Sequence, residues 1–87
     1  MYSKEVIVTN KTGLHARPAS EFVKEASKFK SAVSIEFKEK KINAKSIINV
    51  LSIGISAGSK IIISAEGEDE KQAVDELVNL VETKFKE

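Results

Sequence analysis

His15 is the only histidine in the chain, and Pro18, which follows shortly after it, is the only proline. Proline has a preset φ and no N–H, so it fits the first turn of a helix and little else in it. The pair therefore predicts that His15 lies at, or just before, a helix N-terminus. The exposed backbone N–H groups and the helix dipole attract an anion there. The same field disfavours an imidazolium, so His15 is expected to be neutral and nucleophilic near pH 7.

These residue types together suit phosphoryl transfer. A neutral imidazole nitrogen can attack phosphorus without a separate general base, and Arg17 offers a planar fork of donors to phosphoryl oxygens. Ala16 and Pro18 complete the predicted helix start at which the phosphoryl group would bind. The alternative is that His15 is an ordinary polar surface residue, which is the commoner case for a lone histidine. A metal site is disfavoured, because the chain has no second histidine and no cysteine.

Ser46 precedes an apolar, largely β-branched segment, Ile47–Ile53. The simplest interpretation is a structural N-cap, which typically contributes about 1 kcal/mol. The alternative is a regulatory phosphorylation site, since a phosphate is stabilised at a helix N-terminus. A helix this short buries only one face, so some of Ile47, Ile48 and Leu51 are expected to be exposed as a docking patch for another protein. A helix wedged into the core explains the same pattern equally well.

The segments around these residues predict the order β-α-β-β-α-β-α. Strands are expected over residues 5–9, 33–37, 41–44 and 60–66, and helices over residues 16–29 and 47–53. A third helix is expected after a capping box formed by Asp69 and Gln72, with an apolar stripe that runs from Ala73 to Phe85. Gly54 is expected just beyond the end of the second helix. Helices with one apolar face and strands with alternating apolar residues predict an α+β domain, an antiparallel sheet covered on one side by helices.

Length and composition limit the classes of function. The 87 residues suffice for one domain, so residues 1–87 are expected to form a single unit. With 14 basic and 13 acidic residues, the chain offers no electrostatic footprint for nucleic acid or an anionic membrane. No segment approaches the roughly 20 apolar residues that span a bilayer, and charged Lys4 and Glu5 stand where a signal peptide is apolar. A cytoplasmic location is expected, and nothing argues for an obligate oligomer, so we expect a monomer.

Two motifs, Thr12–Ala19 and Asn43–Ile48, resemble the HPr family, the histidine-containing phosphocarrier proteins of the bacterial phosphoenolpyruvate-dependent sugar phosphotransferase system. The chain length and the order of elements match too, so the resemblance covers essentially the whole chain. It implies an open-faced β-sandwich, a four-stranded antiparallel sheet with three helices on one face. It also implies a stoichiometric carrier rather than an enzyme, and no cofactor.

The resemblance further implies roles for individual residues. His15 would accept a phosphoryl group on Nδ1 from phosphorylated enzyme I and donate it to sugar-specific enzyme IIA proteins, with Arg17 as the charge partner of that group. Ser46 matches a regulatory serine of members from low-GC Gram-positive bacteria. There an HPr kinase/phosphorylase modifies the serine, and the modified form acts as corepressor for a catabolite control regulator. The presence of His15 also separates this chain from related regulatory paralogues that lack the active histidine.

The chain departs from the common family pattern after Ser46. Many members carry methionine at the positions of Ile48 and Leu51 and glycine at that of Asn49. Methionine adapts to several partners more readily than a branched aliphatic side chain. We therefore expect these departures to alter partner affinities, the corepressor contact included, more than the fold or the phosphoryl chemistry.

Two other classes of function stay open as alternatives. An RNA-binding domain of RRM or KH type needs stacking aromatics on its sheet or a GxxG loop, whereas the strands here offer only Phe37, with Tyr2 just ahead of the first strand. A protein-binding regulatory module would keep the apolar docking patch and never phosphorylate His15. An enzyme with its own small substrate is least favoured, because the sequence has no paired carboxylates, no glycine-rich phosphate loop and no triad.

Overall fold

The computed structural model describes residues 1–9, 13–14 and 16–84, with the backbone alone for residue 84. The strands are β1 (Tyr2–Ile7), β2 (Ala32–Phe37), β3 (Lys40–Asn43) and β4 (Lys60–Glu66). The helices are α1 (Ala16–Ala26), α2 (Ile47–Ser52) and α3 (Glu70–Asn79), and α3 runs on into a π-helical turn, η1 (Leu80–Lys84). This succession confirms the predicted element order and the α+β class.

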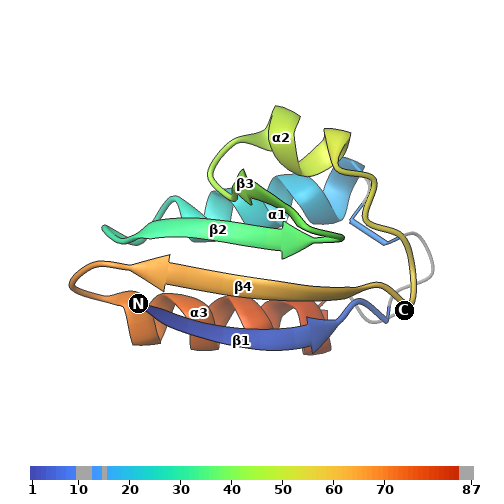
Figure 1. Ribbon diagram of the computed structural model, residues 1–87. Coiled ribbons are helices and arrows are strands. Elements are labelled where there is room, and N and C mark those ends of the chain that lie inside the picture. The colour runs from blue at the N-terminus through green and yellow to red at the C-terminus, as the bar shows by residue number, and fades with distance from the viewer. Residues whose placement is uncertain (10–12, 15, 85–87) are drawn as a thin grey trace.

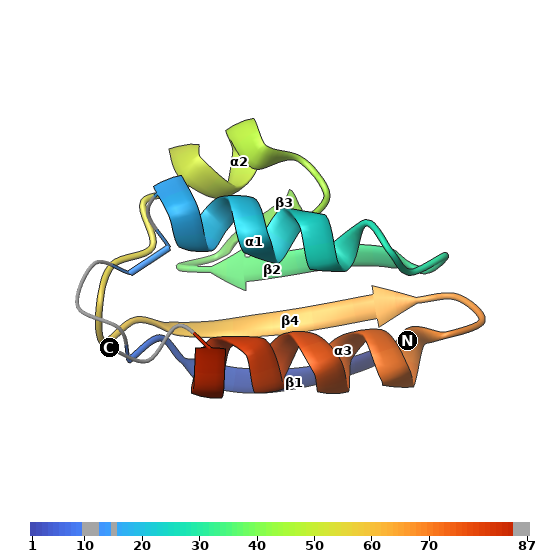
Figure 2. The ribbon, with the colours of Figure 1, turned by 180° about the vertical axis from the view of Figure 1, so that it is seen from behind.

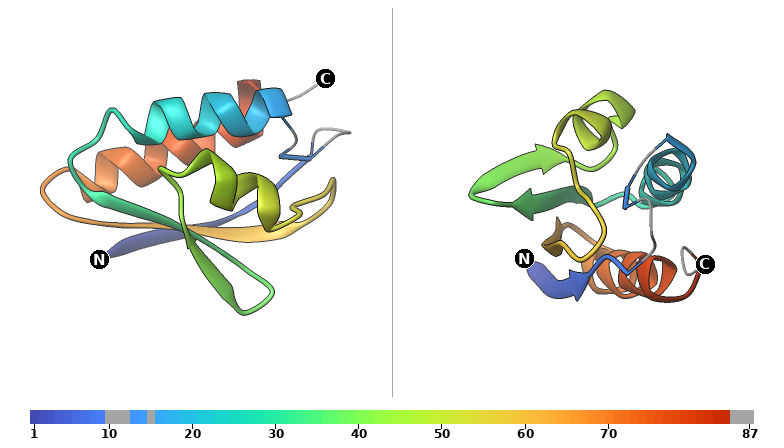
Figure 3. Two further views of the ribbon diagram at one scale, coloured as in Figure 1. Left: turned by 90° about the horizontal axis from the view of Figure 1, so that it is seen from above. Right: turned by 90° about the vertical axis from the view of Figure 1, so that its right-hand side faces the viewer.

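The four strands form one antiparallel sheet in the order β1-β4-β2-β3. The late strand β4 therefore lies between β1 and the β2–β3 hairpin (Figure 1). The helices lie on one face of this sheet, and the other face is left uncovered (Figures 2 and 3). The fold is thus the expected open-faced β-sandwich. None of the described helices has the length and apolarity needed to cross a membrane.

The hydrophobic core lies between the sheet and the helices. Alternate residues of β2 and β4 face it and are buried, and Phe22 of α1 and Leu77 of α3 are fully buried against them. Burying a side chain of this size contributes about 1.5–3 kcal/mol. The apolar residues that alternate along these strands therefore face the core, and the residues between them lie on the open face of the sheet.

Several element boundaries differ from the prediction by one to three residues, among them the start of β1 and the end of α1. β1 begins at Tyr2 because the polar residues Tyr2–Lys4 pair with Ile63–Ala65 of β4, and the Tyr2 hydroxyl donates a hydrogen bond to Asp75 Oδ1 over 3.1 Å. α1 ends at Ala26 because the next amides, those of Lys28 and Phe29, bond to carbonyls only three residues back. That tighter turn is the usual way in which an α-helix finishes.

The predicted capping box of Asp69 and Gln72 is wrong. Asp69 is the N-cap residue of α3, but its side chain makes no capping hydrogen bond. Its carboxylate instead accepts hydrogen bonds from the backbone N–H groups of Lys30 and Ser31, each over 2.9 Å, and from the Ser31 hydroxyl. Gln72 donates to Glu76 within the same helix. The carboxylate thus fastens the entry of β2 to the start of α3.

We expect this fastening to make stability depend on Asp69 in acid. The Ser31 hydroxyl, followed by the Lys30 N–H group, lowers the pKa of Asp69 to about 2. An unfolded aspartate has a pKa of about 4, so the stabilisation is complete above pH 4 and disappears as the pH falls from about 4 to about 2. Asp69→Asn should lower the unfolding temperature at pH 7, and the gap to the parent should close over that acid range.

Thermal unfolding of both proteins between pH 7 and pH 2 measures the gap. Glu21→Gln removes one negative charge from an exposed position on α1 and serves as the control for net charge. A gap between the parent and Asp69→Asn that stays constant down to pH 2 would contradict the assignment.

Candidate functional site

The residues on both sides of His15 belong to the start of α1 and to the loop ahead of it. His15 itself lies outside the described residues, whereas Leu14 and Ala16 lie within them. Helix α1 begins at Ala16, so Pro18 occupies its first turn, as predicted. That first turn contains no acidic residue. The positive end of the helix dipole therefore faces outward without a carboxylate of its own helix to offset it.

Arg17 is the one cationic residue in the first turn of α1. Its side chain is exposed and forms no ion pair with another of the described residues. Ala16 is also exposed, and Pro18 is half-buried. The guanidinium is thus available to an anion at the helix start, where exposed backbone N–H groups already favour one.

The segment ahead of α1 packs directly on the loop that follows α2. Gly13 has a φ of 65°, and a Cβ atom at this position would lie 2.4 Å from the carbonyl oxygen of Ile55 and 2.7 Å from Cα of Ser56. The backbone N–H of the buried Leu14 donates a hydrogen bond to the same Ile55 oxygen over 3.1 Å. Gly13 lies within the motif Thr12–Ala19, but the motif did not predict this contact. The sequence feature that could have indicated this contact is a glycine followed by an apolar residue just before the histidine.

Ser46 caps α2 as the structural interpretation predicted. Its backbone is extended, with a φ of −109° and a ψ of 113°, and its Oγ accepts a hydrogen bond from the Asn49 N–H over 3.4 Å. That distance is long for a hydrogen bond, and the residue is half-buried. Gly54 follows the C-cap residue Ile53 with a φ of 72°, as expected for the residue beyond a helix end.

Helix α2 exposes part of its apolar surface. Ile48 is 75% exposed and Leu51 is 44% exposed, and their spacing puts them on one side of the helix. Val50 is fully buried on the opposite side. Ile47 is half-buried and packs against the core, so it belongs only partly to this surface. The expected exposure is thus confirmed for Ile48 and Leu51, which we call the α2 patch.

The structure brings some of the predicted site residues together and separates others. Helices α1 and α2 contact each other (Figure 3). Ile55, shortly after the end of α2, bonds to Leu14, so the C-terminal end of α2 lies next to the segment that enters α1. Ser46 caps the N-terminal end of α2. It therefore lies at the end of α2 away from Leu14, whereas the α2 patch lies between the two.

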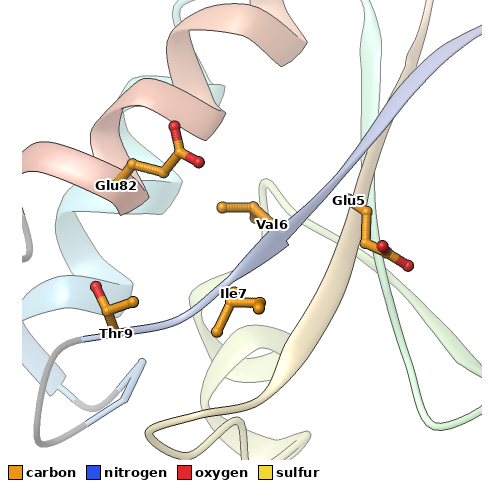
Figure 4. A pocket seen from close by; sticks show the side chains of 5 residues that line it. All are labelled: Glu5, Val6, Ile7, Thr9 and Glu82. Atoms are coloured by element: carbon orange, nitrogen blue, oxygen red, sulfur yellow. The ribbon is translucent and has the colours of Figure 1, made fainter.

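A shallow depression at the end of β1 offers no comparable chemistry. Glu5, Val6, Ile7, Thr9 and Glu82 line it. The two carboxylates lie on opposite sides of Val6 and Ile7 and do not point toward each other (Figure 4). Among the described residues there is also no cluster of acidic, histidine or cysteine side chains that could hold a metal ion.

Comparisons with known proteins agree on one family. The family model for the "PTS HPr component phosphorylation site" matches residues 2–83. The phosphocarrier protein HPr of Buchnera aphidicola (subsp. Acyrthosiphon pisum) is 49% identical over 77 residues, 88% of this chain and 91% of that protein. The HPr-like protein Crh of Halalkalibacterium halodurans is 48% identical over 82 residues, 94% of this chain and 98% of that protein.

Solved structures lead to the same family. Two crystal structures of HPr from Thermoanaerobacter tengcongensis, the second a dimer, are each 50% identical in sequence to this chain. The first has a TM-score of 0.95 and matches 98% of this chain and 96% of its own length. The dimer has a TM-score of 0.79 and matches 100% of both chains. These names are those of a phosphate carrier and not of an enzyme. The fold, the family model and the relatives show together that this chain belongs to the HPr family, the histidine-containing phosphocarrier proteins of the phosphotransferase system.

Proposed function

We propose that the chain accepts a phosphoryl group on His15 from phosphorylated enzyme I and passes it to sugar-specific enzyme IIA proteins. The observation that carries this proposal is the start of α1. The helix begins directly after His15, its first turn has no acidic residue, and Arg17 is exposed beside it. An incoming phosphoryl group would meet backbone N–H donors, the positive end of the dipole and a guanidinium.

The chemistry needs no other group from this chain. The Nδ1 lone pair of neutral His15 attacks phosphorus, and the bond from phosphorus to the donor breaks as the new N–P bond forms. Arg17 offsets the charge on the equatorial oxygens, which is the main demand of such a transfer. The same steps in reverse hand the group to the next protein. This cycle suits a stoichiometric carrier that works as a monomer in the cytoplasm.

We propose that the α2 patch, together with the edge of Ile47, docks both partners. Its exposed apolar surface belongs to a helix whose far end lies beside Leu14, so a protein seated on Ile48 and Leu51 would reach the start of α1. Surfaces of this kind typically mark protein–protein contacts. Enzyme I and the enzyme IIA proteins would use the same patch in turn.

Ser46 is proposed as the regulatory site. The residue is half-buried, and within the described part of the chain its hydroxyl is held only by a long hydrogen bond, so a kinase would have little to displace. The similarity to Crh proteins, one of which is the catabolite repression HPr of Bacillus subtilis, also supports a link to catabolite control. An HPr kinase/phosphorylase would modify Ser46, and a catabolite control regulator would bind the modified form.

Ser46→Asp is expected to slow phosphorylation by enzyme I about tenfold without unfolding the domain. The added charge lies on the same short helix as the α2 patch, and it disfavours apolar docking through repulsion and desolvation. Aspartate still caps the helix, so stability should change little. Ser46→Ala loses the cap without adding charge and should keep the parent's rate. A Ser46→Asp protein that accepts phosphate as fast as the parent would remove this mechanism.

Intact-mass analysis after incubation with enzyme I, phosphoenolpyruvate and magnesium tests the carrier function. One acid-labile phosphoryl adduct is expected, and it should pass to an excess of an enzyme IIA protein once enzyme I and phosphoenolpyruvate have been removed. A folded sample that gains no adduct beside active enzyme I would instead support the regulatory module. Retention on single-stranded RNA at moderate salt would revive the RNA-binding alternative.

A further inference from the structure

The segment that carries His15 is held at both ends by one loop, Ile55–Ser59, which we call the clamp loop. At the exit from β1, the Val8 N–H donates to the Ser59 carbonyl over 2.9 Å, and the Gly58 N–H donates to the Val8 carbonyl over 2.7 Å. At the entry to α1, the Leu14 N–H donates to the Ile55 carbonyl. The loop runs beside both places in the ribbon (Figures 1 and 3).

Two serine side chains give the clamp loop its shape. The Ser56 N–H donates to Ser59 Oγ over 3.2 Å, the Ser59 N–H donates to the Ser56 carbonyl over 3.1 Å, and the two hydroxyls lie 3.3 Å apart. Ser56 is exposed and Ser59 is half-buried, so neither side chain fills the core. The hydroxyls therefore fix the course of the loop and contribute little to the hydrophobic packing of the domain.

We infer that the clamp loop sets the position of the phosphoryl acceptor, with Ser56 and Ser59 as positioning residues. This inference rests on the proposed role of His15. The close seat of Gly13 on Ile55 and Ser56 means that a shift of the loop must also shift Leu14, the residue next to His15. Transfer rates respond steeply to such shifts, since a misplacement of about 1 Å can cost up to about 100-fold.

Ser59→Ala tests the inference, because it removes the hydroxyl that accepts from Ser56 and leaves the backbone bonds to Val8 possible. We expect kcat for phosphorylation by enzyme I to fall about five- to tenfold with KM unchanged, since the α2 patch is untouched. Ser59→Thr keeps the hydroxyl and should restore the rate. Ser27→Ala is the matched control. Like Ser59→Ala, it removes one serine hydroxyl that is bonded to the backbone, here an exposed one at the opposite end of α1.

Two further measurements separate this inference from the proposed function. Hydrogen exchange at the Leu14 amide should become faster in Ser59→Ala, and NMR titration of the His15 imidazole should give a different midpoint from the parent's, with neither change in Ser27→Ala. Unchanged kcat and exchange in Ser59→Ala, or a loss of rate that Ser59→Thr does not restore, would overturn the inference. If the parent took no phosphate at all, the proposed function would fail, and Leu14 exchange would still decide whether the loop acts as a clamp.

Discussion

Replacing His15 by alanine is expected to abolish the acid-labile phosphoryl adduct completely. The chain contains no other histidine and no cysteine, so no comparable nucleophile can take over. The start of α1 with Arg17 would still attract the phosphoryl group, but attraction without an attacking lone pair forms no bond. Intact-mass analysis with enzyme I and phosphoenolpyruvate, over times that saturate the parent, measures the effect.

The fold of the His15→Ala protein should be preserved, because the core is formed by apolar residues of the strands and helices. Matching thermal unfolding curves for the variant and the parent would establish this. A kinase acting on Ser46 should still add an acid-stable phosphate to the variant, which shows that the protein is otherwise competent. An acid-labile adduct at the parent's level in His15→Ala would place the acceptor elsewhere and defeat the proposed function.

Local patterns predicted the parts of the fold that local chemistry decides. The β-branched run Lys60–Glu66 became β4 with the same bounds, since such residues favour an extended chain and no tertiary contact opposed it. Ser46 capped α2, and Gly54 took the left-handed conformation beyond its end. These outcomes follow from backbone geometry within a few residues, which the sequence states directly.

Contacts between distant segments were not predictable in the same way. Periodicity shows which face of an element is apolar but not what will cover it, so it predicted that some of Ile47, Ile48 and Leu51 are exposed without showing that Ile47 is the one packed against the core. The Asp69 carboxylate could accept hydrogen bonds either from the first N–H groups of α3 or from the residues that lead into β2. It accepts them from the N–H groups of Lys30 and Ser31, next to β2. The contact of Gly13 with Ile55 exists only because the sheet brings the end of β1 beside the start of β4.

That last contact gives the largest stability effect that we expect near the site. Gly13→Ala places a methyl group in the left-handed region, which costs an L-residue about 1–2 kcal/mol. The methyl group would also meet the backbone of Ile55 and Ser56, which cannot rotate away as a flexible side chain would. Overpacking of this kind costs about a further 1–3 kcal/mol. We therefore expect the free energy of unfolding, measured by urea denaturation, to fall by about 2–5 kcal/mol.

Gly54→Ala separates the two contributions. Gly54 has nearly the same φ, 72° against 65°, but a Cβ atom there would have no neighbour within 4 Å. Its loss should be confined to about 1–2 kcal/mol of backbone strain, so the difference between the two variants measures the close seat on the clamp loop. Equal losses would mean that the loop moves aside freely, and a loop that yields so easily could not hold the residue next to His15 in place. A clearly larger loss of unfolding free energy in Gly13→Ala than in Gly54→Ala would show that the loop does not yield to the added methyl group. If the folded Gly13→Ala protein is also phosphorylated more slowly, the rigid contact of Gly13 with the clamp loop contributes to phosphoryl transfer.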